Sequence, residues 1–174
     1  NVFRPNEIDS GKWILIGGSH DLAEPFSSNN RIDHNLFDGK SQPGNFITID
    51  GSASPNALSS TYDRIDHNHF RDTRPRITNG KEAIRVGWSA MSRTSGFTLV
   101  EANLFEDCDG DPEIISVKTN DNVIRQNTFV RSAGTLSLRH GDRNTVEGNF
   151  FFGEGKAGTG GVRLYGDDHR VYNN

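Results

Sequence analysis

The hydrophobic and polar positions of the chain repeat as a short motif rather than as a helical stripe. An aliphatic residue is followed by two variable residues, an asparagine, any residue and a phenylalanine, as in residues 32–37 and 65–70. Three more copies cover residues 100–105, 124–129 and 146–151, and partial copies cover residues 1–3 and 171–174. The asparagines recur at intervals of 22 to 35 residues, which is typical of a solenoid, a propeller or a repeat array.

A second repeating segment lies between the asparagine motifs. It alternates apolar and polar side chains, as a half-buried strand does, and its copies are residues 46–49, 83–86, 114–117, 135–138 and 161–164. Helical repeats would need a 3.6-residue periodicity, and a propeller would need longer antiparallel blades. The pattern therefore predicts an all-β solenoid, a right-handed parallel β-helix. Each asparagine and phenylalanine should stack on its equivalent one turn away.

Length and composition agree with this fold. The 174 residues suit one domain over residues 1–174, and 19 glycines with only 32% hydrophobic residues suit many short strands joined by turns. The sequence opens and closes inside a repeat, and the polar caps that solenoids need are not visible. We therefore expect residues 1–174 to be a core portion of a longer β-helix.

Charge and apolar content exclude other classes of protein. A net charge of −4 disfavours a nucleic-acid partner, because such proteins usually carry a basic surface. It does not exclude an anionic substrate, since the local placement of charge matters more than the total. No apolar run approaches the roughly 20 residues of a membrane span. The single cysteine, Cys108, excludes an intramolecular disulfide and is expected to be a packed thiol.

Stacking the second segment in register places its outward side chains in columns. One column contains Arg85, Ser116, Ser137 and Arg163, and the next contains Gly87, Lys118, Arg139 and Tyr165. Neighbouring strands lie about 4.8 Å apart, so Lys118 and Arg139 should be adjacent cations. From spacing alone, a surface charge lattice with the nearby acidic residues explains this pair as well as a catalytic site does.

Oxygen-bearing side chains precede the same two strands. Asp109, Asp111 and Glu113 lead into the strand of Lys118, and Asn79 and Glu82 lead into the strand one coil below. Carboxylate and amide oxygens are the ligands that calcium prefers. The sequence therefore predicts a calcium site beside the two cations.

Several of these segments resemble polysaccharide lyase family 6, which contains alginate lyases and chondroitin B lyase on parallel β-helices. The similar segments are residues 111–118 (Asp-Pro-Glu-Ile-Ile-Ser-Val-Lys), 138–141 (Leu-Arg-His-Gly), 160–163 (Gly-Gly-Val-Arg) and 166–169 (Gly-Asp-Asp-His). The resemblance begins at residues 31–35 and continues to the C-terminus. The sequences of residues 79–85 and 139–141 are more similar to the alginate lyases than to chondroitin B lyase.

The resemblance implies cleavage of alginate by calcium-assisted β-elimination. Lys118 matches the general base that takes the C5 proton of a uronate, and Arg139 matches the general acid at the departing glycosidic oxygen. Asn79, Asp111 and Glu113 match the calcium ligands, although some members have glutamate at the position of Asp111 and some work without calcium.

The resemblance also implies how the substrate is held. Arg85, His140 and Arg163 match positions that bind the sugar and its carboxylate. Tyr165 continues the column of Lys118, where substrate contact and simple stacking explain it equally well. An alginate partner further implies a secreted or periplasmic protein. No leader sequence is visible in residues 1–174.

Three other functions remain open. A chondroitin B (dermatan) lyase belongs to the same family. A pectinase-like hydrolase would use paired carboxylates and would leave Lys118 and Arg139 without a role. A non-catalytic polyuronate-binding β-helix is the third, since a fold alone does not fix a function. The repeated pairs Asp33-His34 and Asp66-His67 occur in step with the asparagines, so we interpret them as a structural stack rather than a metal site.

Overall fold

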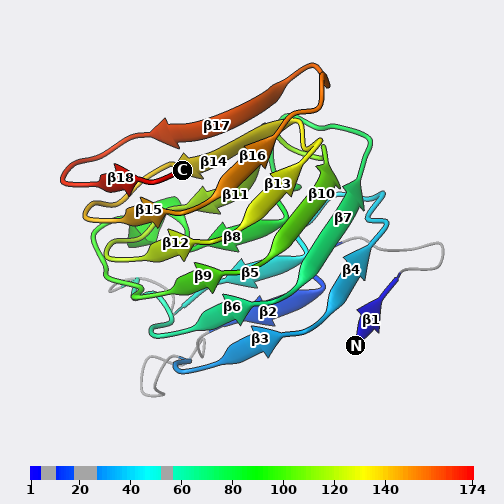
Figure 1. The fold of residues 1–174 in the computed structure, drawn as a ribbon. Helices are drawn as coiled ribbons and strands as arrows, with labels where there is room; N and C mark the ends of the chain where they lie inside the picture. Colours follow the sequence, from blue (N-terminus) through cyan, green and yellow to red (C-terminus); the bar gives the residue numbers. More distant parts are fainter. Residues whose placement is uncertain (5–10, 18–26, 52–56) are drawn as a thin grey trace.

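The strands form three parallel sheets that wind around a common core (Figure 1). The computed structural model describes residues 1–4, 11–17, 27–51 and 57–174. Each coil contributes one strand to each sheet, and the only other regular element in these residues is a 3-10 turn at Ser89–Met91. The predicted parallel β-helix is confirmed. No helix in the described residues has the length and apolar character needed to cross a membrane.

Each sheet contains six strands in the order of the coils. Sheet A consists of β1 (Val2–Phe3), β4 (Leu36–Asp38), β7 (His69–Thr73), β10 (Leu104–Cys108), β13 (Thr128–Val130) and β16 (Phe150–Phe152). Sheet B consists of β2 (Ile14–Ile16), β5 (Ile47–Ile49), β8 (Ile84–Val86), β11 (Glu113–Val117), β14 (Gly134–Leu138) and β17 (Thr159–Leu164). Sheet C consists of β3 (Arg31–Asp33), β6 (Arg64–Asp66), β9 (Leu99–Glu101), β12 (Val123–Arg125), β15 (Thr145–Glu147) and β18 (Arg170–Tyr172).

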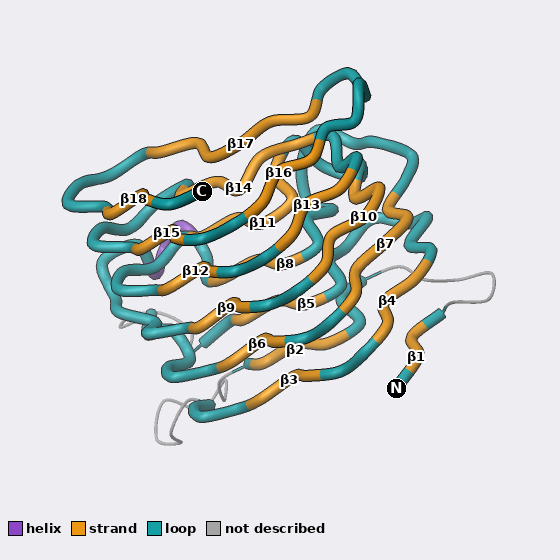
Figure 2. Tube along the Cα trace, viewed as in Figure 1, coloured by secondary structure: helices purple, strands orange, loops and turns teal. Residues whose placement is uncertain are grey.

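The asparagine motif spans the corner between sheets C and A (Figure 2). The chain bends there because the residue before each ladder asparagine has a positive φ, as at His34 and Ala102. The asparagines then join successive coils: Asn68 donates its side-chain amide to Asn103 at 3.1 Å, and Asn103 donates to Asn127 at 3.0 Å. Each copy of the asparagine motif therefore contains the end of one strand, a hydrogen-bonded corner and the start of the next strand.

Phenylalanines of the same motif fill the interior next to this corner. Their rings stack between coils with centroids 4.7–5.0 Å apart, through Phe3, Phe37, Phe70, Phe105, Phe129 and Phe151. Aliphatic residues of sheets B and C complete the core. The predicted asparagine and phenylalanine stacks are both confirmed.

The histidine pairs and the cysteine are structural, as predicted. The rings of His34 and His67 stack with centroids 5.0 Å apart, and each histidine contacts its neighbouring aspartate. Cys108 lies in the core, where burial raises the pKa of its thiol. The histidine stack therefore belongs to the repeat of the solenoid, and the cysteine belongs to its core.

Candidate active site

The pairing of sheet B aligns the predicted columns. Ser116 pairs with Arg85 below it and with Ser137 above it, and Ser137 pairs with Arg163. Lys118 and Arg139 follow the paired residues Val117 and Leu138 at the ends of β11 and β14. The backbone N–H of Lys118 donates to Val86 and that of Arg139 donates to Val117, each at 2.8 Å. The sheet therefore holds the two cationic residues at equivalent positions on successive coils.

The turn after Arg139 depends on a glycine. Gly141 has a φ of +80°, and a Cβ at this position would lie 2.3 Å from the carbonyl oxygen of Thr119. Only glycine allows this left-handed turn to approach the backbone of the preceding coil so closely. The turn fixes His140, whose own N–H donates to Val117 at 3.1 Å.

A pocket of about 400 Å³ lies over these strand ends. Most of the predicted site residues line it, namely Asn79, Asp111, Glu113, Lys118, Arg139, His140 and Arg163. Thr78, Ser89 and Pro112 complete the lining. The fold thus gathers the predicted base, the predicted acid and the predicted calcium ligands in one cavity. Arg85 and Tyr165 lie outside its lining.

Glu113 is the centre of the charge network in the pocket. Its carboxylate contacts the guanidinium of Arg163, accepts a hydrogen bond from the Ser137 hydroxyl at 3.3 Å, and lies 3.6 Å from Nε of Arg139. Ser137 in turn accepts a hydrogen bond from Nε of Arg163 at 3.1 Å. The carboxylate therefore orients two guanidinium groups that face the same cavity.

The positive charges also act on His140. Burial lowers the pKa of its imidazole, and the charges of Arg139 and Lys118 lower it further. The neutral imidazole is therefore the favoured form near neutral pH. A neutral ring has one N–H that can donate to a sugar hydroxyl.

Asp111 is held by the backbone. Its carboxylate accepts the N–H groups of Lys81 at 3.1 Å and Glu113 at 2.9 Å. Burial nevertheless raises the pKa of this carboxyl, and the neighbouring charge of Glu113 adds to the shift. The backbone thus fixes the position of Asp111, while its burial disfavours the charged form of the carboxyl.

These residues fit a bound cation. An amide and two carboxylates line one pocket, and hard oxygen donors of this kind suit calcium. The described residues contain no cluster of three or more acidic, histidine or cysteine side chains arranged around a metal. Calcium takes about six to eight oxygen ligands, so an ion held by Asn79, Asp111 and Glu113 would also take oxygens from water or from the substrate.

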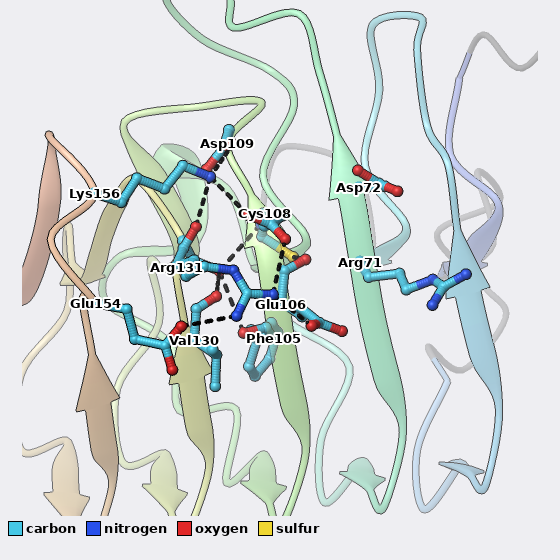
Figure 3. A network of polar contacts seen from close by, with 12 residues as sticks. Arg71, Asp72, Phe105, Glu106, Cys108, Asp109, Val130, Arg131, Glu154 and Lys156 are labelled. Carbon is cyan, nitrogen blue, oxygen red and sulfur yellow. Dashed lines mark hydrogen bonds and ion pairs between the residues drawn. The ribbon is translucent and has the colours of Figure 1, made fainter.

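Asp109 does not belong to this donor set. It pairs with Lys156 at 2.5 Å (Figure 3). It also accepts the N–H of Ala133 at 2.8 Å. Lys156 also donates to Asp107 at 2.8 Å and to the carbonyl oxygen of Arg131 at 2.7 Å. Sequence reasoning missed Lys156, because its partners are far away in the chain. Its only local signal is that it is a basic residue in a glycine-rich loop.

Tyr165 lies at the upper edge of the site. Its ring centroid is 5.2 Å from the guanidinium carbon of Arg139 and 5.5 Å from that of Arg163, within the range of cation–π contacts. Its carbonyl oxygen contacts Nε2 of His169 at 2.8 Å. Tyr165 is 46% exposed, so its ring supports both guanidinium groups while one side stays open to solvent.

Arg85 lies under the opposite edge and is buried rather than exposed. Its guanidinium stacks on the ring of Trp88, with 3.5 Å between the guanidinium carbon and the ring centroid. Sequence reasoning placed Arg85 on an open outer face and did not single out Trp88. The reason is that the segment after β8 folds back over the sheet, which strand periodicity does not reveal.

Known protein families and solved structures include several that this chain resembles. The family model described as Chondroitinase B matches residues 4–174, whereas no curated protein gives a significant match. The structure of the alginate lyase AlyF-OU02 in complex with G6 is similar, with a TM-score of 0.79 and 32% identity over 94% of this chain and 33% of that chain. The family 6 alginate lyase AlyGC is 36% identical over 99% of this chain and 25% of its own, with a TM-score of 0.70.

A third similar structure is a mannuronic acid specific polysaccharide family 6 lyase from human gut microbiota. It is 33% identical with a TM-score of 0.69, over 92% of this chain and 38% of that chain. The chain thus spans between a quarter and two fifths of these solved structures. Together with the family-model match over residues 4–174, the comparisons show that the chain belongs to polysaccharide lyase family 6.

Proposed function

We propose that this chain carries the active site of an alginate lyase, which cleaves its polymer by calcium-assisted β-elimination. The observation that supports this most is the single pocket lined by Lys118, Arg139, Asn79, Asp111 and Glu113. The alginate lyases among the similar structures support the choice of polymer.

In this mechanism Lys118 is the base. Its uncharged amine takes the C5 proton of a uronate, and the electrons of the C5–H bond form a C4–C5 double bond. The C4–O bond then breaks, and the glycosidic oxygen leaves with the electron pair. Arg139, at the equivalent position one coil on, stabilises the charge on that oxygen and donates a proton to it.

The remaining residues hold the uronate. Arg163 and Tyr165 orient its carboxylate, Arg85 binds below them, and His140 donates from its neutral ring to a sugar hydroxyl. A calcium ion bound by Asn79, Asp111 and Glu113 would neutralise the substrate carboxylate and acidify the C5 hydrogen. A carboxylate that enters the pocket meets an Arg163 already oriented by Glu113 and Ser137.

The test is the ultraviolet absorbance of unsaturated uronate ends released from alginate, with calcium and with a chelator. Absorbance that rises with calcium and stops with the chelator is the expected result. New reducing ends without absorbance would instead indicate a hydrolase. Binding of alginate without either product would indicate a polyuronate-binding β-helix.

A dermatan lyase is the second candidate, because the matching family model is described as Chondroitinase B. The same absorbance assay with dermatan in place of alginate separates the two polymers. Faster release from alginate is expected, and faster release from dermatan would reverse the assignment.

We further infer that the protein acts outside the cytoplasm, in a secreted or periplasmic form. A long anionic polymer does not cross a membrane, so its lyase must meet it on the outer side. Activity in the culture medium or periplasmic fraction is expected. Activity confined to the cytoplasmic fraction would contradict the inference.

A further inference from the structure

Part of the pocket comes from a connecting segment and not from a strand. Residues 74–83 join β7 to β8, and Thr78 and Asn79 of this segment line the pocket. Both residues are exposed, and the side-chain amide of Asn79 forms no hydrogen bond with another described residue. The amide is therefore held in place by the anchors of its segment and not by contacts of its own.

Lys81 is the deepest anchor of the 74–83 segment. It is only 1% exposed, whereas lysine is almost never fully buried. Its ammonium donates to the carbonyl oxygen of Ser41 at 2.6 Å, in the coil below, and to that of Pro75 at 3.1 Å, within the segment. Hydrogen bonds from a charged donor are stronger than those from a neutral one. One side chain thus fastens the segment both to itself and to the previous coil.

Lys81 also contacts the coil above. Its backbone N–H donates to the carboxylate of Asp111 at 3.1 Å. A Cβ on Gly110 would lie 2.9 Å from both Cγ and Cδ of Lys81, so the lysine stem fills the space that a side chain at this position would need. Lys81 therefore joins three successive coils, and its uppermost partner is a predicted calcium ligand.

Two other anchors hold the segment nearer to solvent. The backbone N–H of Ile77 donates to the carbonyl oxygen of Gly110 at 2.8 Å, and the guanidinium of Arg76 donates to that of Ala133 at 2.7 Å. Arg76 is exposed, so water competes for its hydrogen bond and the net stabilisation is small. The buried side chain of Lys81 is therefore the anchor on which the position of the segment most depends.

We propose that Lys81 is a positioning residue for the calcium ligands of the pocket: its buried side chain fixes the 74–83 segment and so holds the amide of Asn79 in place with the carboxylate of Asp111. The inference rests on the proposed function and deepens it. A ligand that is already ordered loses less conformational freedom when the ion binds. Groups that orient metal ligands without touching the metal contribute about 10–100-fold to metal affinity.

Isothermal titration with calcium tests the proposal in Lys81→Met, which keeps the length of the stem and removes the ammonium. The Kd for calcium should rise by about tenfold or more. Because Lys81 does not line the pocket, kcat should return to the wild-type value at saturating calcium. Lys40→Met is the matched control, since Lys40 is also 1% exposed and does not line the pocket. It should lower the thermal midpoint without changing the Kd for calcium.

A second variant keeps the ammonium and displaces its stem. Gly110→Ala places a methyl group against Cγ and Cδ of Lys81, and it should also raise the Kd for calcium. The increase should be smaller in a protein that already carries Lys81→Ala, because the shorter side chain leaves room for the methyl group. Equal increases in the two backgrounds would contradict the role given to the lysine stem.

A nitroxide label on Asn79→Cys reports the position of the segment without calcium. Cys108 is buried, so the label reacts at residue 79. Below the thermal midpoint of each protein, the electron paramagnetic resonance spectrum should show an immobilised label, and a more mobile one after Lys81→Met. Lys40→Met should leave the spectrum unchanged. Equal label mobility with and without Lys81→Met would overturn the proposal.

The two hypotheses fail differently. If the wild-type protein releases unsaturated ends but Lys81→Met keeps its Kd for calcium, the positioning role is wrong and the proposed lyase stands. If Lys40→Met weakens calcium binding as much as Lys81→Met does, the effect is a general loss of stability and the positioning role is again wrong. If no polyuronate yields unsaturated ends but Lys81→Met still weakens calcium binding, the proposed function is wrong and the role of Lys81 stands.

Discussion

Two regions of the β-helix treat polar groups in opposite ways. At the corner between sheets C and A, each interior ladder asparagine donates to the next coil and accepts from the previous one. On the outer face of sheet B, Nε of Arg85, the hydroxyl of Ser116 and Nε1 of Trp88 are buried without hydrogen-bond partners, as is one carboxylate oxygen of Glu82. The corner repeats one residue type through seven positions. The outer face changes its residue type from coil to coil.

The contrast separates stability from function. Identical stacked residues satisfy one another, and their hydrogen bonds add up along the solenoid. The pocket instead gathers three cations, two acids and an imidazole from neighbouring coils, an arrangement that serves a ligand better than it serves the fold. Changes at the corner should therefore affect unfolding, and changes at the pocket should affect activity.

The largest effect on stability is expected for Asn103→Ala. This change removes the acceptor of the Asn68 amides and the donor to the carbonyl oxygen of Ile65, all of which are buried. Each buried group left unpaired costs about 1–3 kcal/mol, so the free energy of unfolding should fall by about 3 kcal/mol or more. Urea denaturation measures it. Asn79 is exposed, so Asn79→Ala should change the free energy of unfolding by less than about 0.5 kcal/mol. Equal losses of stability in the two variants would contradict the contrast between the corner and the pocket.

A smaller and pH-dependent effect is expected for Asp66→Asn. The hydrogen bond from Arg31 is the main reason that the pKa of the Asp66 carboxyl falls to about 2. Because this pKa is lower in the folded than in the unfolded state, the stabilisation is complete above the unfolded value near 4 and is lost as pH falls through 2. We expect about 1 kcal/mol at pH 7, because the arginine partners are half exposed.

Unfolding of Asp66→Asn and the wild-type protein at pH 7 and pH 2 tests this dependence. The difference in the free energy of unfolding between the two proteins should be present at pH 7 and mostly lost at pH 2. Asp33→Asn is the matched control one coil away, where the carboxylate is 36% exposed and the effect should be smaller. A difference that grows toward low pH would contradict the assignment.

The smallest effect on stability is expected for Lys156→Met, which lies between the two regions. Its ammonium ties the loop before β17 to Asp107 and Asp109, and Asp109 lies two residues before Asp111. We expect a loss of about 1 kcal/mol or less, since the side chains are partly exposed. We also expect weaker calcium binding by isothermal titration calorimetry. Lys156→Arg should restore both the stability and the calcium binding. Normal calcium binding in Lys156→Met would show that Lys156 only stabilises the loop.

Much of the fold could be predicted because each coil carries the same few residue types at equivalent positions. One asparagine and one phenylalanine per coil predicted the solenoid and its stacking partners. The alternating segment between these motifs predicted the register of sheet B, which placed Lys118 beside Arg139. The bend inside the motif was not visible. It depends on a left-handed residue before each asparagine, and that position holds types as different as His34, Ala102 and Gln126.

The site was harder to predict wherever a contact depends on a segment outside the repeat. Asp109 lies in the acidic segment that predicted calcium binding, but its carboxylate forms an ion pair with Lys156, from a loop 47 residues further on. Arg85 looked exposed until Trp88 was seen to cover it. Strand alternation tells which side of a sheet a residue faces, but it cannot tell what covers that side.

The most direct test of the central claim measures Lys118→Ala by two quantities, the release of unsaturated ends from alginate and the free energy of unfolding. Removal of a general base lowers a rate by about 10²–10⁴-fold. We expect a loss of this size with unfolding within about 0.5 kcal/mol of the wild-type protein. Undiminished release of unsaturated ends by a folded Lys118→Ala protein would contradict the account.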